Sequence, residues 1–279
     1  MNCNKLKEEL VKIFNKIGVK YGRTVFVQSE LISFMDAARQ VTPSVLPELI
    51  TDSLLEAVGD TGTVVVPTFT TDCAHKGVPF DLVHTPCDTG LLANYLRCLP
   101  DASRSLHPVL SVCALGRLAK HFTKDISRGC YCLDSPFDRM ALEDTIIVRL
   151  GMAWNLSNTF SHYIENRLSL PYLYNKVLDF IKVSIDGLPV DQLFYMSVRY
   201  LDFDIQYDHR RQIEVVAQSG FVRFAQWGGG ILYSIELKDY MELLKYHLKK
   251  DSFFLLSRRP SFRQGERPFD GSVIKNLDE

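Results

Sequence analysis

The sequence NTFSHYIENRLSLPYLYNK, residues 158–176, follows an apolar run at residues 145–150 that predicts a buried strand. Within it, Thr159, His162 and Glu165 recur at every third position. If the segment is helical, successive members turn by about 300°, so the three side chains fall within an arc of about 120°. The pattern therefore predicts a histidine with a hydroxyl one turn before it and a carboxylate one turn after it.

This arrangement suits proton transfer, because histidine is the side chain whose ordinary pKa lies closest to neutral pH. A carboxylate that holds one ring nitrogen leaves the other nitrogen to face a reactant. A purely structural interpretation also stays open. Thr159 would then cap the helix by accepting from the His162 amide, Glu165 would be a solvated first-turn carboxylate, and His162 would be half-buried. Three residues at regular spacing are weak evidence, so the choice between the catalytic and the structural interpretation depends on the rest of the chain.

The composition is that of a globular protein with a sizeable core. The 279 residues are 46% hydrophobic and 23% charged, and 32 basic against 33 acidic residues give a formal net charge of −1. No global field favours nucleic acid or an anionic membrane, so neither is expected as a partner. The one local basic cluster, residues 257–267, is interpreted as a solvated tail.

Cysteine usage points to a reducing compartment. The seven cysteines are irregularly spaced, and residues 1–14 are charged and amphipathic rather than a secretory signal. We therefore expect reduced thiols in a cytoplasmic protein. No apolar stretch is long enough to cross a bilayer.

The order of patterns predicts an α/β fold: a mixed sheet flanked by helices, with strand–helix alternation in the first half and hairpins in the second. Strands are expected at 24–27, 63–66, 109–115 and 145–150, and helices near the N-terminus and at 42–58, 91–99, 207–220 and 240–248. Asp186-Gly187 and residues 227–230 are hairpin signals. Residues 129–139 are expected to form a loop.

Polar residues follow two of the predicted strands. Residues 28–31, Gln-Ser-Glu-Leu, stand where an open α/β sheet binds ligands. Residues 68–71, Thr-Phe-Thr-Thr, form a hydroxyl-rich loop after the strand at 63–66. The irregular segment 71–90 comes next and is the predicted acceptor-side loop.

Several common site types are excluded by spacing. Asp72, Cys73 and His75 cluster, but no cysteine pair has the spacing of a structural zinc site, so no metal is expected. The chain lacks a P-loop and a G-x-S-x-G nucleophile motif. Residues 103–108, Ser-Arg-Ser-Leu-His-Pro, remain a candidate anion site, although the alternative is a turn whose arginine pairs with a surface carboxylate.

Five separated pieces together resemble one family, the aminoglycoside 3-N-acetyltransferases. They occur in the family's order over residues 25–176, and beyond residue 176 the match is one of general layout. The pieces are V-x-S-x-L at 27–31, G-D-x-G-T-x-V-x-P-T-F-T at 59–70, R-S-x-H-P at 104–108, S-P-F at 135–137, and N-T-x-x-H-x-x-E at 158–165 with Pro171-Tyr172 after it. One departure is Gln28, where the family often has histidine.

The resemblance implies a single domain over residues 1–279 and roles for particular residues. His162 would be the general base, Glu165 its orienting carboxylate and Thr159 a polar partner near the thioester. Acetyl-CoA would be the co-substrate. The residues expected to contact CoA are Ser29, Leu31, Thr68, Thr70, Arg104, Ser105 and His107, and those expected to contact the acceptor are Asp72 and Asp134.

The predicted function is acetyl transfer from acetyl-CoA to an amine of a sugar or aminoglycoside-like acceptor. No covalent enzyme intermediate is required, so the missing nucleophile motif is no objection. The alternatives are a catalytically silent CoA- or sugar-binding relative, and an N-acyltransferase with another acyl group or a nucleoside or phosphonate acceptor. The sequence leaves the acceptor, the regiochemistry and the oligomeric state open, with a homodimer as one option.

Overall fold

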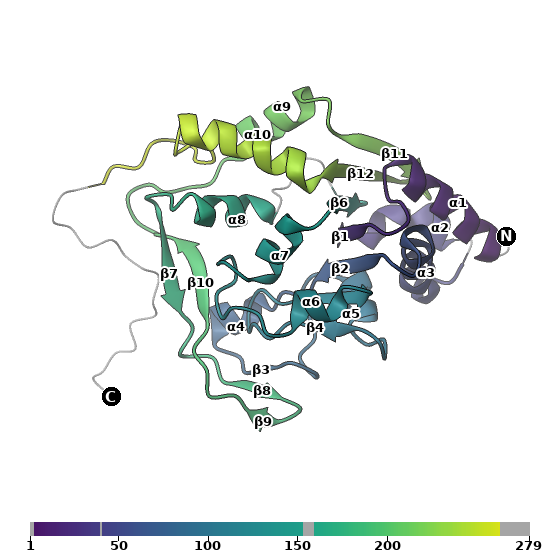
Figure 1. Ribbon diagram of the computed structural model, residues 1–279, viewed down its shortest axis with the longest axis horizontal. Coiled ribbons are helices and arrows are strands. Elements are labelled where there is room, and N and C mark those ends of the chain that lie inside the picture. The colour runs from purple at the N-terminus through teal and green to yellow at the C-terminus, as the bar shows by residue number, and fades with distance from the viewer. Residues whose placement is uncertain (1–2, 40, 153–158, 263–279) are drawn as a thin grey trace.

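The computed structural model describes residues 3–39, 41–152 and 159–262, and a seven-stranded mixed sheet lies at its centre (Figure 1). Three neighbouring strands are parallel, and the strands beyond them are antiparallel. This confirms the predicted fold class. In spatial order the strands are β11 (Arg223–Trp227), β12 (Gly230–Glu236), β6 (Thr145–Leu150), β1 (Thr24–Ser29), β2 (Thr63–Pro67), β5 (Val112–Gly116) and β4 (Ser103–Arg104).

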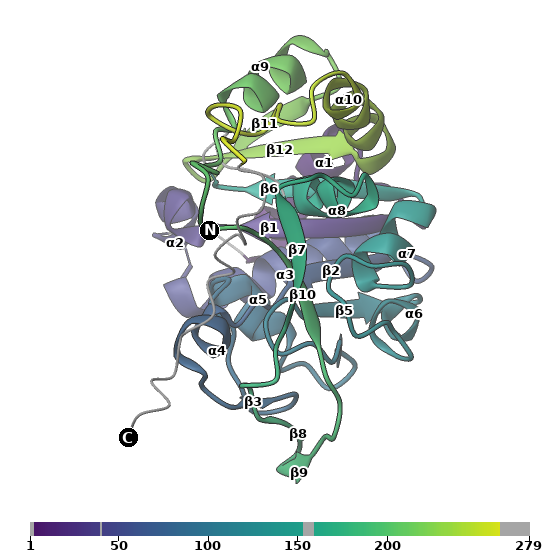
Figure 2. The same cartoon turned by 90° about the vertical axis from the view of Figure 1, so that its left-hand side faces the viewer.

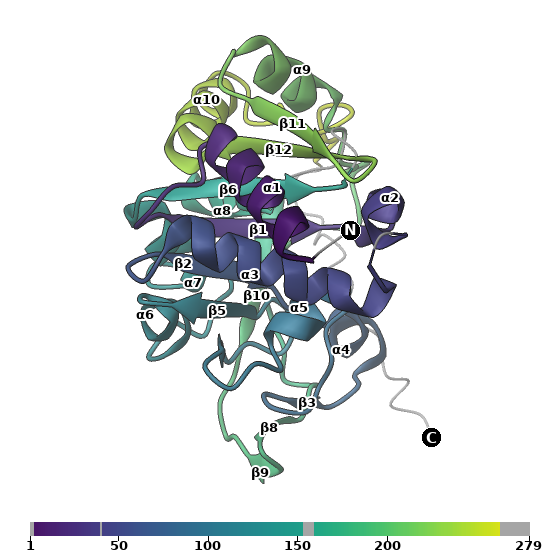
Figure 3. The same cartoon turned by 90° about the vertical axis from the view of Figure 1, so that its right-hand side faces the viewer.

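The parallel strands are short apolar runs because both faces of the sheet are covered. Val25 and Val64 pack into one core, whereas Phe26 and Val65 pack into the other, as the two-residue period of a strand requires. Figure 3 shows the first face, covered by α1 (Cys3–Lys16), α3 (Leu46–Val58) and α5 (Leu91–Leu96). Figure 2 shows the second, covered by α6 (Ala119–Thr123), α7 (Pro136–Leu142), α8 (Phe160–Arg167) and α10 (Leu237–Lys250).

Both predicted hairpins are confirmed. The turn between β8 (Val183–Ile185) and β9 (Leu188–Pro189) is Asp186-Gly187, with φ of 50° and 77°. Gly228 and Gly229 join β11 to β12 with φ of 57° and 88°. Positive φ at both central residues matches the right-handed twist of the flanking strands. The helix expected at 207–220 is α9 (Arg210–Gln218).

The second half also contains a ribbon that local patterns did not predict. In it, β7 (Leu173–Val177) pairs antiparallel with β10 (Tyr195–Arg199). Figure 2 shows this ribbon extending from the level of α8 towards β8 and β9.

Two segments predicted as irregular are partly regular. Residues 71–90 contain α4 (Thr71–Lys76) and β3 (Phe80–Asp81), which pairs with β8, so the prediction of a wholly irregular loop is wrong. A two-residue strand has no local signature and forms only when its distant partner is in place. Residues 129–139 are likewise not all loop, because α7 starts at Pro136, and the Ser135 hydroxyl caps it by accepting from the Asp138 amide.

The parallel strands place several predicted site residues at one edge of the sheet. Gln28 and Ser29 end β1, Thr68 follows β2, and Leu150 ends β6. A short connection, η1 (Leu31–Phe34), α2 (Met35–Ala38) and η2 (Pro43–Val45), then leads from β1 to α3. Asn158 of the motif and part of the basic cluster at 257–267 lie outside the described residues.

Within the described part of the chain, no helix combines the length and the apolar character that crossing a membrane requires. Among the same residues, no group of three or more histidine, cysteine or acidic side chains is arranged to hold a metal ion.

Candidate functional site

The centre of the site is the carboxylate of Glu165, which is fully buried on α8. Three side chains donate to it. His162 reaches it through Nδ1 at 2.7 Å, Tyr172 through its hydroxyl at 2.5 Å, and Tyr207 through its hydroxyl at 3.1 Å. A carboxylate only accepts, so its buried charge is compensated by three donors from three segments of the chain.

This contact fixes the chemistry of the His162 ring. Since Nδ1 donates to Glu165, the neutral ring carries its lone pair on Nε2. The side chain is 33% exposed, and no residue of the described segments hydrogen-bonds Nε2. A half-exposed imidazole held by a buried carboxylate can therefore take a proton from a bound reactant.

Aromatic rings surround the imidazole. The ring of Tyr207 lies edge-on at 5.3 Å and that of Tyr131 at 6.2 Å, centroid to centroid. Tyr207 also stacks on His209. Burial and then the Glu165 charge raise the pKa of both Tyr172 and Tyr207, which keeps their hydroxyls protonated as donors to the carboxylate.

Thr159 directly precedes α8, and its hydroxyl is turned away from the helix. It makes no side-chain capping bond, and instead its Oγ1 accepts from Nε2 of Gln28 at 3.1 Å. The structural alternatives for this segment are therefore wrong for two residues: Thr159 does not cap through its side chain, and Glu165 is not a solvated carboxylate. The backbone bond from the His162 amide to the Thr159 carbonyl, at 3.1 Å, sets the two residues one turn apart.

The other residues predicted near CoA divide into two groups. Ser29 and Leu31 follow β1, with Ser29 partly exposed and Leu31 buried. Thr68 and Thr70 are buried behind β2, where their hydroxyls bond Ser111 at 2.9 Å and the Pro108 carbonyl at 2.6 Å. Ser29 and Leu31 lie close to Gln28 in the chain. Thr68 and Thr70 instead form hydrogen bonds inside the fold with the segment that precedes residue 112.

Arg104 is buried, and its guanidinium is hydrogen-bonded within the fold. Its guanidinium donates to the carbonyls of Thr68 at 3.0 Å and Thr85 at 2.5 Å and to the Ser111 hydroxyl at 3.1 Å, and it lies 4.9 Å from the centre of the Phe80 ring. Burial lowers its pKa to about 10, so it stays charged at neutral pH. Its contact with a CoA phosphate remains a prediction.

We predict that Arg104→Ala lowers the free energy of unfolding by about 3 kcal/mol, because it removes the charged hydrogen bonds to the carbonyls of Thr68 and Thr85 and to the Ser111 hydroxyl. Urea unfolding measures this, with the exposed Arg117→Ala as a control that should change little. A CoA role would appear separately, as a KM for acetyl-CoA that rises far more than the KM for the acceptor. An Arg104→Ala protein as stable as the wild type would contradict the structural role.

Ser105 and His107 are also buried and bonded internally. Ser105 Oγ accepts from the Val112 amide at 2.8 Å. His107 Nδ1 accepts from the Leu110 amide at 2.9 Å, and its Nε2 donates to the Tyr195 carbonyl at 3.1 Å. Burial lowers the pKa of His107 from 6.5 to about 4, so the ring is neutral in the folded protein.

The lowered pKa of His107 predicts that the folded protein loses stability in acid. Between pH 6.5 and about 4 the unfolded chain binds a proton that folded His107 does not, so stability falls as the pH drops through this window. The expected loss is about 3 kcal/mol at most. Urea unfolding at several pH values should show a smaller loss in His107→Asn, whose amide oxygen can accept the same backbone bonds without titrating. Equal pH dependence in both proteins would contradict this assignment.

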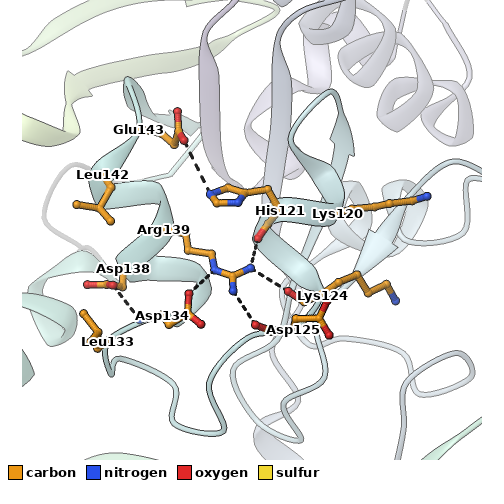
Figure 4. Close-up of a pocket in the computed structure, with 10 residues that line it drawn as sticks. All are labelled: Lys120, His121, Lys124, Asp125, Leu133, Asp134, Asp138, Arg139, Leu142 and Glu143. Atoms are coloured by element: carbon orange, nitrogen blue, oxygen red, sulfur yellow. Dashed lines mark hydrogen bonds and ion pairs between the residues drawn. The ribbon is translucent and has the colours of Figure 1, made fainter.

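The two predicted acceptor carboxylates are not brought to His162 by any described contact. Asp72 is exposed on α4 and pairs with Lys76 at 3.0 Å. Asp134 pairs with Arg139 at 2.7 Å and lines a surface cleft of about 1000 Å³ between α6 and α7 (Figure 4). The residues lining that cleft include neither Thr159, His162 nor Glu165. The acceptor role of both aspartates remains a prediction.

Three residues of the site were not chosen from the sequence as functional: Gln28, Tyr172 and Tyr207. Tyr172 follows Pro171 in the matched motif and Gln28 stands in another, so position in a motif could have identified both. Tyr207 lies 42 residues from Glu165 and carries no local signal.

Residues 36–249 match a family model described as aminoglycoside 3-N-acetyltransferase. Among solved structures, the fold is similar to that of the aminoglycoside acetyltransferase AAC(3)-IVa apoenzyme, at 22% identity and a TM-score of 0.70, over 90% of this chain and 91% of that chain. It is also similar to AAC-IIIb in a binary structure with CoASH, at 19% and 0.71, over 91% and 98%. AAC-VIa bound to sisomicin matches at 20% and 0.71, over 88% and 97%. No curated protein matches the sequence significantly.

Proposed function

Because this chain belongs to the aminoglycoside 3-N-acetyltransferase family, we propose that it transfers an acetyl group from acetyl-CoA to an amine of a sugar or sugar-like acceptor, with His162 as the general base. The enzyme class, an N-acetyltransferase with acetyl-CoA as co-substrate, follows from membership of the family. AAC-IIIb with CoASH and AAC-VIa with sisomicin support the two substrate classes. The continuous sheet supports the prediction of a single domain.

The observation that carries the proposal is the hydrogen bond of 2.7 Å between His162 Nδ1 and the fully buried Glu165. It places the basic lone pair on the partly exposed Nε2 and stabilises the imidazolium that forms when a proton arrives. Tyr172 and Tyr207 hold the carboxylate in this orientation. General base catalysis requires these two properties, access and a stabilised conjugate acid.

The reaction balances with this chain's own groups. The acceptor enters as a neutral amine, and its nitrogen attacks the thioester carbonyl carbon while Nε2 of His162 removes one N–H proton. The new C–N bond forms, the C–S bond breaks, and the imidazolium returns its proton to the leaving CoA thiolate. Thr159 lies one turn from His162, and its hydroxyl would donate to the carbonyl oxygen as that oxygen becomes negative.

The surroundings of His162 suit a sugar. Tyr207, which is partly exposed beside the imidazole, offers a ring on which the apolar face of a pyranose can pack. The carboxylate nearest the imidazole, Glu165, is occupied by three donors within the fold.

Release of free CoA thiol tests the proposal. The purified protein is supplied with acetyl-CoA and, separately, amino sugars, nucleotide-linked amino sugars and aminoglycosides, with the acetylated product identified by mass spectrometry. Thiol release that depends on one acceptor class is expected. Binding of acetyl-CoA without turnover of any amine would overturn the proposal in favour of a binding protein.

A further inference from the structure

Gln28 lies at the inner end of the site and connects it to the sheet. It stands on β1, opposite Arg149 of β6 in the parallel register, on the same side of the strand as Phe26. Phe26 contacts Phe160 of α8, with ring centroids 5.3 Å apart, so Gln28 faces this helix layer. Its Nε2 donates to Thr159 Oγ1 across 131 positions of sequence.

The other end of the Gln28 amide is unsatisfied. Only 9% of the residue is exposed, and its buried Oε1 has no hydrogen-bond partner among the described residues. A buried acceptor without a donor destabilises a fold, and an apolar side chain of similar volume would avoid that cost. Stability alone therefore does not explain a glutamine at this position.

The hydrogen bond from Gln28 determines which part of the Thr159 hydroxyl remains available to a ligand. A hydroxyl has one O–H to donate and two lone pairs, and the Gln28 N–H occupies one lone pair. No described residue accepts the Thr159 hydroxyl proton, and the hydroxyl does not cap α8. The Gln28 contact thus holds the oxygen in place while leaving its proton for a ligand.

We infer that Gln28 is a positioning residue for acyl transfer: it orients the Thr159 hydroxyl so that this hydroxyl donates to the acyl oxygen of the bound thioester. The inference rests on the proposed function, because it requires acetyl-CoA in the site. Gln28 itself does not touch the reacting atoms and acts only through Thr159.

The first test combines Gln28→Met with Thr159→Val. Gln28→Met removes the unsatisfied oxygen and the bond to Thr159 together, so the melting temperature should rise or stay level while kcat falls about tenfold. Thr159→Val should lower kcat by about 10²-fold, as expected for a lost oxyanion donor. The double variant should be no slower than Thr159→Val, because Gln28 acts through that hydroxyl. Gln218→Met, on the exposed side of α9, is the matched control and should change neither quantity.

The second test needs no acceptor. Acetyl-CoA labelled with carbon-13 at the acetyl carbonyl is bound to each protein, and the carbonyl stretch is read by isotope-edited infrared spectroscopy. Hydrogen bonding to the acyl oxygen should move the band to lower wavenumber in the wild type, less in Gln28→Met and not at all in Thr159→Val.

The outcomes separate this inference from the proposed function. A band shift and a kcat that survive Gln28→Met unchanged would overturn the role of Gln28 and leave the proposed function intact. A fall in melting temperature, kcat and acetyl-CoA affinity together would show a structural role instead. Wild-type protein that binds labelled acetyl-CoA but acetylates no amine would remove the proposed transfer, and the band shift would still test the Gln28 contact. Failure to bind acetyl-CoA at all would overturn both.

Discussion

Replacing His162 with alanine is expected to lower kcat about 10²–10⁴-fold and to leave the affinity for acetyl-CoA nearly unchanged. A positioned general base contributes a factor of this size, roughly 3–5 kcal/mol of barrier. The ring is partly exposed and its one hydrogen bond among the described residues goes to Glu165, so its removal should disturb CoA binding little. Steady-state kinetics at saturating acetyl-CoA and acceptor give kcat, and calorimetric titration with acetyl-CoA gives the affinity.

Two controls sharpen this prediction. His84→Ala removes a strongly exposed histidine, paired with Asp186 at 2.9 Å on another part of the surface, and should leave kcat unchanged. Added imidazole should restore part of the activity of His162→Ala, because the missing group is a base. A kcat within a small factor of the wild-type value would show that another group removes the proton.

Replacing Glu165 with glutamine is expected to lower kcat about 10–10²-fold, less than the loss of the ring itself. The amide keeps the shape but removes the negative charge that stabilises the imidazolium. It also brings an N–H₂ group among His162, Tyr172 and Tyr207, so a tyrosine hydroxyl that donates to the carboxylate must instead accept from the amide.

Steady-state kinetics with acetyl-CoA and acceptor at saturation measure the loss of kcat in Glu165→Gln. A kcat equal to that of the wild type would contradict the role of the carboxylate.

The double variant tests whether the carboxylate acts through the ring. His162→Ala with Glu165→Gln should be little slower than His162→Ala alone, because an orienting group has nothing left to orient. Fully additive losses would mean that Glu165 has a separate role, and direct binding of the acceptor's ammonium would be the first to examine. Thermal unfolding of all three proteins separates this result from loss of the fold.

Local sequence determined most of the sheet and its helices. A short stretch of sequence is enough to show which residues of these elements are buried. The β-branched runs therefore located β1, β2 and β6, and the amphipathic spacing located α1, α3 and α10. The glycine-containing turns at Asp186-Gly187 and Gly228-Gly229 set two hairpins for the same reason. The spacing of Thr159, His162 and Glu165 likewise placed the imidazole and its carboxylate on one helix, since i,i+3 neighbours meet in any helix.

Elements and contacts that depend on distant partners escaped the local pattern. The strand β3 exists only beside β8, and the β7–β10 ribbon joins segments about twenty residues apart with weak periodicity. The segment around Arg104 had the residue types of an anion site, but the fold surrounds this arginine with carbonyls from the segments after β2 and β3.

The site shows the same division. The sequence by itself determined that a histidine and a carboxylate would share one turn of a helix. Only the tertiary structure decided that the carboxylate is buried beneath the hydroxyls of Tyr172 and Tyr207, and that Gln28 holds Thr159. The physical reason is range. Helical geometry fixes contacts three residues apart, whereas contacts across 42 or 131 residues form only when the packing of the sheet and the layer of α8 brings the segments together.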